Sequence, residues 1–242
     1  MAIIPTLRTS TQLSGFLFHA HLHQSPAFTS IICPLGLCKS EGLASPAPNE
    51  PHDLTPWADG ARVIEEFTSP TFNEKGKGWW NLWGKDPSTV HWAGPIVVLD
   101  PHLSCWSFEG SSGLITLQLI GNATITSVQM AHPVEAHLLK FAPQDFIVWA
   151  LVDSDSFSVK EIPRHVTPPP NLERLVSNGL YPINLGTFSF EVTSHPAGQS
   201  FAIDAGALES YGGRVDKVMF HLLGNWGAKR TCVYHLRVFG GL

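Results

Sequence analysis

The sequence has few charged side chains and no long apolar run. Asp, Glu, Lys and Arg make up 14% of its 242 residues, and the formal net charge is -5. Without a cluster of Lys and Arg the chain offers no basic surface for a phosphate backbone, so we expect no nucleic-acid partner. No stretch reaches the roughly 18 uninterrupted apolar residues that a membrane-spanning helix needs. The apolar start is soon followed by Arg8 and is not a well-formed secretory signal.

Cysteine is also scarce, whereas glycine and proline are plentiful. Four cysteines are too few to scaffold a disulfide-rich domain. The 21 glycines and 19 prolines favour short strands and many turns over long helices. A hydrophobic content of 43% is enough for one substantial core, and we therefore expect one main domain.

Residues 1–52 are predicted to form an irregular, poorly ordered N-terminal arm, because the prolines of 46–51 exclude a helix or a central strand there. Three histidines of the arm have the alternate spacing with which a strand could hold zinc: His19, His21 and His23. No carboxylate or cysteine lies near them, so we expect no metal site. We interpret the C-x4-C pair, Cys33 and Cys38, as incidental because it lacks a second pair.

Residues 53–242 have the pattern of short strands. Apolar side chains alternate with others in 114–119, 188–192 and 218–222, which indicates strands with one buried and one wetter face. Turn residues separate such runs at four places: Gly121-Asn122, Ser154-Asp155, Pro196-Ala197-Gly198 and Gly212-Gly213. Three consecutive prolines mark an irregular insertion over about 161–182. The predicted fold is all-β, an antiparallel β-sandwich.

Two motifs in this region resemble a known family. The first is C-W-x-F-x-G at 105–110, and the second is N-W-G-x-x-x-T-C-x-Y-x-x-R-V-x-G at 225–240. Shorter matches occur, in the same order as in the family, at 59–64, 68–71, 142–146, 185–190 and 199–201. Over roughly 53–241 the chain resembles the SUN domain, a β-sandwich similar to galactose-binding modules.

The resemblance implies a non-enzymatic adaptor of the nuclear envelope. SUN domains lie in the perinuclear lumen, bind C-terminal KASH peptides between the protomers of a trimer, and so link the nucleus to the cytoskeleton as part of the LINC complex. Such proteins carry a transmembrane helix and a coiled coil before the domain, and neither is found in this chain before residue 53. We therefore expect the isolated chain to be mainly monomeric, with membrane attachment only through a segment absent from it.

The resemblance also assigns roles to single residues. Cys105 and Cys232 match cysteines that bond to each other in the family, the alternative being two buried free thiols. Residues expected around the end of the KASH peptide match family groove positions in part: His132 and Tyr234 match, whereas Arg230 replaces a tyrosine and Phe141 a serine. Thr68 stands where animal proteins have a cysteine that bonds to the peptide, so we expect no such crosslink.

Two loops are expected to surround this site. The segment 71–92 occupies the place of the family's KASH lid, which clamps the peptide by adding a strand to it. The alternative is that the tryptophans of this segment only cover the edge of the sandwich: Trp79, Trp80, Trp83 and Trp92. The second loop matches a family loop whose backbone carbonyls hold a monovalent cation such as potassium, although the loop is shorter here. The residues whose carbonyls would bind the cation are Val97, Asp100, His102 and Ser104.

Other interpretations of the sequence remain open. Asn122-Ala123-Thr124 is a sequon for N-glycosylation, meaningful only in a lumenal protein. A carbohydrate-binding β-sandwich is the alternative function, because the SUN fold looks like galactose-binding modules and tryptophans in loops, such as Trp79 and Trp80, could stack on sugar rings. Hydrolysis is not expected, since no G-x-S-x-G or H-E-x-x-H occurs and the available carboxylates lie within family structural motifs: Asp100, Glu109 and Asp145.

Overall fold

A computed structural model describes residues 51–72, 92–100, 105–153, 167–192 and 198–242. Its strands are β1 (His52–Asp53), β2 (Arg62–Val63), β3 (Trp92–Ala93), β4 (Cys105–Glu109), β5 (Gly113–Ala131), β6 (Asp145–Asp153), β7 (Leu180–Ser189), β8 (Gln199–Ala202), β9 (Val215–Leu222), β10 (Arg230–Val233) and β11 (His235–Gly241). The helix α1 spans Leu172–Ser177, and the 3-10 turns are η1 (Trp57–Asp59), η2 (Glu65–Phe67), η4 (Pro95–Leu99), η5 (Leu139–Phe141) and η7 (Ala205–Tyr211). Among these described residues no helix is long and apolar enough to cross a membrane.

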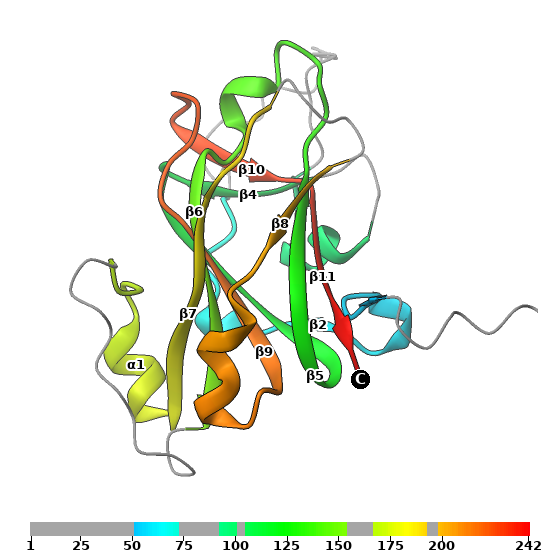
Figure 1. Ribbon diagram of the computed structural model, residues 1–242. Helices are drawn as coiled ribbons and strands as arrows, with labels where there is room; N and C mark the ends of the chain where they lie inside the picture. Colours follow the sequence, from blue (N-terminus) through cyan, green and yellow to red (C-terminus); the bar gives the residue numbers. More distant parts are fainter. Residues whose placement is uncertain (1–50, 73–91, 101–104, 154–166, 193–197) are drawn as a thin grey trace, which may run out of the picture. The chain divides into compact units, whose positions relative to one another are not determined.

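The long strand β5 belongs to both layers of a β-sandwich (Figure 1). Its first half pairs with β2 and β9, and β9 continues through β6 to the edge strand β7. Its second half pairs with β11 and β8. These pairings are antiparallel, which confirms the predicted fold class.

The predicted turn at Gly121-Asn122 is wrong, because β5 continues through both residues. The strand bends there, and its register against β9 shifts between Gln118 and Ala123. Ala123 is fully buried and pairs with Val215. Its burial and its pairing in the sheet favour a continuous strand with a register shift over a turn that leaves the sheet. The predicted turn at Gly212-Gly213 does occur before β9, where φ angles of 84° and 69° favour residues without a Cβ.

Aromatic rings from both layers fill the core between them. Phe146 of β6 and Phe188 of β7 face Phe201 of β8, with ring centroids 5.1 and 5.2 Å from that of Phe201. Phe220 of β9 joins them at 6.2 Å from Phe146. The period-two pattern in 188–192 and 218–222 therefore correctly predicted which side chains face this core.

The side of β9 that points away from this core is not exposed to solvent, contrary to the sequence prediction. Met219 and His221, expected on a wetter face, are 0% and 2% exposed. A second apolar cluster covers this face and includes side chains of η2 and α1: Phe67, Leu114, Ile147, Trp149, Leu151, Leu175 and Met219. A single strand's periodicity could not show that two distant segments pack over it.

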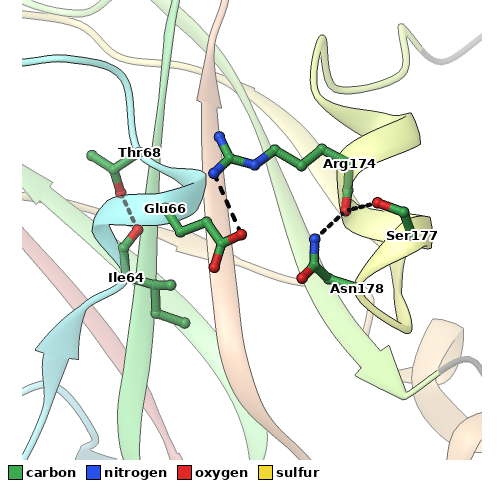
Figure 2. A network of polar contacts seen from close by, with 6 residues as sticks. All are labelled: Ile64, Glu66, Thr68, Arg174, Ser177 and Asn178. Carbon is green, nitrogen blue, oxygen red and sulfur yellow. Dashed lines mark hydrogen bonds and ion pairs between the residues drawn. The ribbon is translucent and has the colours of Figure 1, made fainter.

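The predicted irregular insertion over 161–182 is also wrong in its second part, which contains α1 and the start of β7. The helix forms because Leu175 is fully buried in the second cluster, which stabilises a segment too short to be helical alone. Figure 2 shows Arg174 of α1 reaching Glu66 of η2, with a nitrogen to oxygen distance of 3.4 Å. The same figure shows the Thr68 hydroxyl donating to the Ile64 carbonyl at 2.8 Å, which closes η2.

A small three-stranded sheet, in the order β10-β4-β3, lies beside the sandwich. β10 runs antiparallel to β4, with Arg230 opposite Glu109, whereas β3 runs parallel to it. The first family motif seen in the sequence forms β4, and the second forms β10 and continues into β11 of the larger sheet. Arg230 begins β10, and Tyr234 lies between β10 and β11.

Candidate functional site

A disulfide joins Cys105 of β4 to Cys232 of β10, with 5.6 Å between their Cα atoms. This confirms the predicted pair and excludes two free thiols. Both cysteines are buried, and Tyr234 packs with them, so the bond lies at the centre of a third apolar cluster. Phe141 and Leu138 lie against the same cluster. The disulfide thereby ties together two parts of the chain that both contribute to the candidate site.

His132 and Tyr234 form the inner side of the site. Their ring centroids are 4.9 Å apart in an edge-to-face arrangement. The Nδ1 atom of His132 lies 2.8 Å from the Pro133 carbonyl, which can only accept, so Nδ1 carries the proton in this geometry. The other ring nitrogen, Nε2, is buried and has no hydrogen-bond partner among the described residues. A buried acceptor without a partner is a natural point for a ligand N–H or O–H group.

Burial also sets the protonation states of these two rings. It lowers the pKa of His132 from its ordinary value, only partly opposed by the hydrogen bond to Pro133 and the charge of Glu135. It raises the pKa of Tyr234, and the negative charge of Glu135 raises it further. Both rings are therefore neutral at physiological pH, and any positive charge at the site must come from another residue.

Arg230 supplies that charge at the outer side of the site. Its guanidinium carbon lies 5.2 Å from the ring centre of Phe141 and 5.4 Å from that of Phe72. Two aromatic rings within cation–π distance of the guanidinium favour a cation at this point. The backbone N–H of Phe72 donates to the Ser107 carbonyl at 2.7 Å, which fixes the chain of Phe72 beside β4.

All four residues predicted around the peptide's end are thus close to the disulfide, although two were assigned from substitutions of family residues. The sequence analysis missed Phe72. It lies within the predicted lid segment, in which only the tryptophans were predicted to contribute. An aromatic residue directly after Thr71 was the available signal, and Thr71 itself accepts a hydrogen bond from the Trp106 indole at 3.1 Å.

The sequence analysis also missed the structural role of Asn225. Its amide nitrogen donates to the carbonyls of Ala228 and Arg230 and to the Thr231 hydroxyl, at 3.0 to 3.1 Å. Its amide oxygen accepts from the N–H groups of Gly227 and Ala228. One buried side chain therefore shapes the loop that leads into β10 and holds the backbone of Arg230. The N-W-G motif contained this signal, because Asn followed closely by Gly is typical of a side-chain-ordered turn.

Thr68 is occupied by structural contacts. Its hydroxyl donates to the Ile64 carbonyl and accepts the N–H of Thr116 at 3.1 Å, joining η2 to β5. A threonine oxygen cannot form a disulfide, so the absence of a covalent bond to a peptide remains the prediction for this position.

Only part of the predicted cation loop is described. The Val97 carbonyl accepts the N–H of Asp100 at 3.1 Å within the turn η4, so one of the expected ligands already has a partner. His102 and Ser104 lie outside the described residues. Binding of a potassium-like cation here stays a prediction.

Several other predicted residues also lie outside the described part of the chain. They are the arm histidines and cysteines (His19, His21, His23, Cys33 and Cys38) and three lid tryptophans (Trp79, Trp80 and Trp83). Trp92 is described through its backbone, which pairs with Cys105. Trp79 and Trp80 were the residues named for the alternative of carbohydrate binding, and that alternative stays a prediction.

The three carboxylates considered for hydrolysis come from separate elements. Asp145 begins β6 and accepts a hydrogen bond from the Ser189 hydroxyl. Glu109 ends β4 opposite Arg230, and Asp100 follows η4. Over the described ranges, no three His, Cys, Asp or Glu side chains are grouped so that they could hold a metal ion.

Comparison with known proteins identifies the family. The model of the Sad1/UNC-like C-terminal family matches residues 97–164 and 175–242, which include both cysteines of the disulfide and all four predicted peptide-binding residues. The chain belongs to this family, the SUN domain family. Its unmatched residues between the two segments fall within the predicted insertion over 161–182.

Curated SUN-family relatives agree with this assignment. The chain is 26% identical to human sperm-associated antigen 4 protein over 189 residues, which cover 75% of this chain and 36% of that protein. It is 27% identical to human SUN domain-containing protein 5 over 195 residues, covering 76% and 42%. The chain therefore spans less than half the length of these relatives.

Solved structures give a more distant similarity. A carbohydrate-binding module from Clostridium perfringens, CpGH89CBM32-5 in complex with GalNAc-beta-1,3-galactose, aligns with a TM-score of 0.47 and 11% identity. The alignment covers 78% of this chain and all of that one. A family 32 module from Streptococcus pneumoniae EndoD aligns at 0.41 and 14%. Similarity at this level says nothing about what the SUN domain described here binds.

Proposed function

We propose that this SUN domain is a non-enzymatic adaptor of the nuclear envelope that binds the C-terminal peptide of a KASH-type protein. The observation that carries the proposal is the grouping of Arg230, Phe141, His132 and Tyr234 around one disulfide. Two segments far apart in sequence build this site, and the residues match positions that surround the peptide in the family. On this basis the domain would help link the nucleus to the cytoskeleton.

Arg230 is the proposed partner of the peptide's terminal carboxylate. Its guanidinium carbon lies 5.4 Å from the ring centre of Phe72 and 5.2 Å from that of Phe141. The planar guanidinium group can donate two parallel hydrogen bonds to one carboxylate. In the family a tyrosine occupies this position, so we infer that recognition here depends more on charge.

His132 and Phe141 complete the proposed site. The unpartnered Nε2 of His132 can accept a hydrogen bond from a ligand N–H or hydroxyl group. Phe141 removes a hydroxyl that the family offers to the carboxylate, but its ring stabilises the arginine that replaces it. With Thr68 in place of the crosslinking cysteine, we propose that binding is reversible.

The test compares peptides that differ only at the terminal carboxylate. In the family the peptide lies between protomers, so residues 1–242 would be fused to a trimeric coiled coil and the trimer verified by sedimentation. Affinities for a KASH-type peptide with a free C-terminus and for its amide would be measured by fluorescence anisotropy. Losing a hydrogen bond to a charged group should cost about 1.5 to 3 kcal/mol, roughly 10- to 150-fold in Kd.

Two variants separate the role of Arg230 from a general loss of binding. Arg230→Ala should erase most of the difference between the acid and the amide peptides. Arg214→Ala, at an exposed arginine whose guanidinium bonds to the Asn122 carbonyl, should leave that difference unchanged. Equal affinity for both peptides would refute the carboxylate mechanism. Failure of the verified trimer to bind any KASH tail would refute the adaptor function.

A further inference from the structure

The chain contains a single sequon for N-glycosylation, Asn122-Ala123-Thr124. Each of the other asparagines lacks a serine or threonine two positions later. Any enzymatically removable N-glycan on residues 1–242 must therefore be attached to Asn122. A threonine in the third position also provides the hydroxyl that the sequon requires.

The folded domain leaves this triplet accessible. Asn122 and Thr124 are both exposed, whereas Ala123 between them is fully buried, as expected for alternate residues of a strand. The triplet begins where β5 bends and its register against β9 shifts. A cavity of about 660 Å³ adjoins it, lined in part by Asn122, Tyr211 and Arg214. A sugar attached to Asn122 has open space beside it and needs no rearrangement of the core.

The disulfide indicates a compartment in which such a modification takes place. Structural disulfides persist in oxidising compartments and are rare in the cytosol. Cys105 and Cys232 form such a bond in the core of the domain. The perinuclear lumen implied by the proposed function is continuous with the lumen in which N-glycans are transferred, and the inference rests on that location.

We propose that Asn122 is N-glycosylated. The donor is an oligosaccharide joined through a diphosphate to a lipid carrier, supplied by the lumenal transferase. The amide nitrogen of Asn122 forms a bond to the anomeric carbon of the sugar and loses one proton. The bond from that carbon to the diphosphate breaks, and the lipid diphosphate leaves. No oxidation or reduction is involved.

The position of Asn122 keeps the glycan away from the peptide site. In Figure 1 the bend of β5 lies at the opposite end of the sandwich from β4 and β10, which carry the disulfide. A glycan at the bend projects from the far end of the domain. Peptide binding and glycosylation are therefore independent properties that can be tested separately.

The test directs residues 1–242 to the secretory lumen of animal cells with a cleavable signal peptide. The product should show a mobility shift that PNGase F removes, and peptide mass spectrometry should find Asn122 converted to aspartate after that treatment. Asn122→Gln and Thr124→Ala should each abolish the shift, whereas Thr124→Ser should retain it. Asn178→Gln, a change at another asparagine lining the same cavity but outside any sequon, should have no effect.

Two further measurements keep the result interpretable. The state of Cys105 and Cys232, read by non-reducing peptide mapping, reports whether the domain folded in the lumen. An unmodified Asn122 overturns the proposal whether or not the disulfide forms, and a missing disulfide would in addition contradict the lumenal location. Coiled-coil trimers carrying Asn122→Gln should bind KASH-type peptides as the parent does, so a failure of glycosylation is distinct from a failure of the adaptor function.

Discussion

Removing the disulfide should strongly destabilise the domain. The bond closes a loop with a sequence separation of 127, and in the chain-entropy model a loop of this size stabilises the folded state by about 5 kcal/mol at 25 °C. Most domains are stable by only about 5 to 15 kcal/mol. Loss of the bond should therefore remove between a third and all of the free energy of unfolding.

Urea denaturation of oxidised and reduced protein measures this difference directly. Both samples should carry Cys33→Ala and Cys38→Ala, so that Cys105 and Cys232 are the remaining thiols. Reduction keeps both sulfur atoms in the core, which separates the effect of the bond from that of packing. The double variant Cys105→Ala and Cys232→Ala should be less stable than reduced protein, because it also removes buried sulfur from beside Tyr234.

The shape of the unfolding curve provides a second check. Without the bond the unfolded chain is less restricted and exposes more surface, so the slope of the free energy against urea concentration should rise as the midpoint falls. If oxidised and reduced proteins unfold at the same midpoint with the same slope, the loop-closure argument is refuted. The bond would then serve only to position Tyr234 and Arg230.

Two further changes test the loop and the second apolar cluster. Asn225→Ala should cost about 1 to 3 kcal/mol in urea denaturation, because it leaves buried partners such as the Thr231 hydroxyl without one of their hydrogen bonds, whereas Asn178→Ala should cost much less. Burial lowers the pKa of His221 from its ordinary value of 6.5, so the unfolded chain binds more protons below that pH and stability is lost as the pH falls. His221→Leu should therefore reduce the slope of the unfolding free energy against pH by up to about 1.4 kcal/mol per pH unit, whereas the control His137→Gln should not. An unchanged slope in His221→Leu would contradict the lowered pKa of His221.

The sequence was sufficient for the family, the fold class and the disulfide. The fold class follows from alternating apolar residues, which can be recognised in the sequence alone. The family, and through it the disulfide, follows from two motifs whose residue types and spacing are specific. Of the four residues of the proposed peptide site, Arg230 and Tyr234 lie in the second motif, and His132 and Phe141 lie in the sequence between the two motifs. Their family positions, not any physical pattern of their own, brought them together in the prediction.

The errors lie where distant segments decide the outcome. Gly121 and Asn122 have the local chemistry of a turn, but burial of Ala123 between two neighbouring strands keeps β5 continuous. The alternation in 218–222 predicted a wetter face, which α1 and η2 instead cover. Neither covering segment can be recognised from the strand itself.

By itself the sequence determined a β-sandwich, because strand periodicity is visible along the chain, and its resemblance to the SUN domain implied the cysteine pair. Only the tertiary structure decided that the rings of Phe72 and Phe141 both lie within cation–π distance of the Arg230 guanidinium. It also decided that the sequon lies at the bend of β5, at the other end of the sandwich from β10 (Figure 1). Such proximities depend on packing between residues many positions apart, and packing is a property of the folded chain.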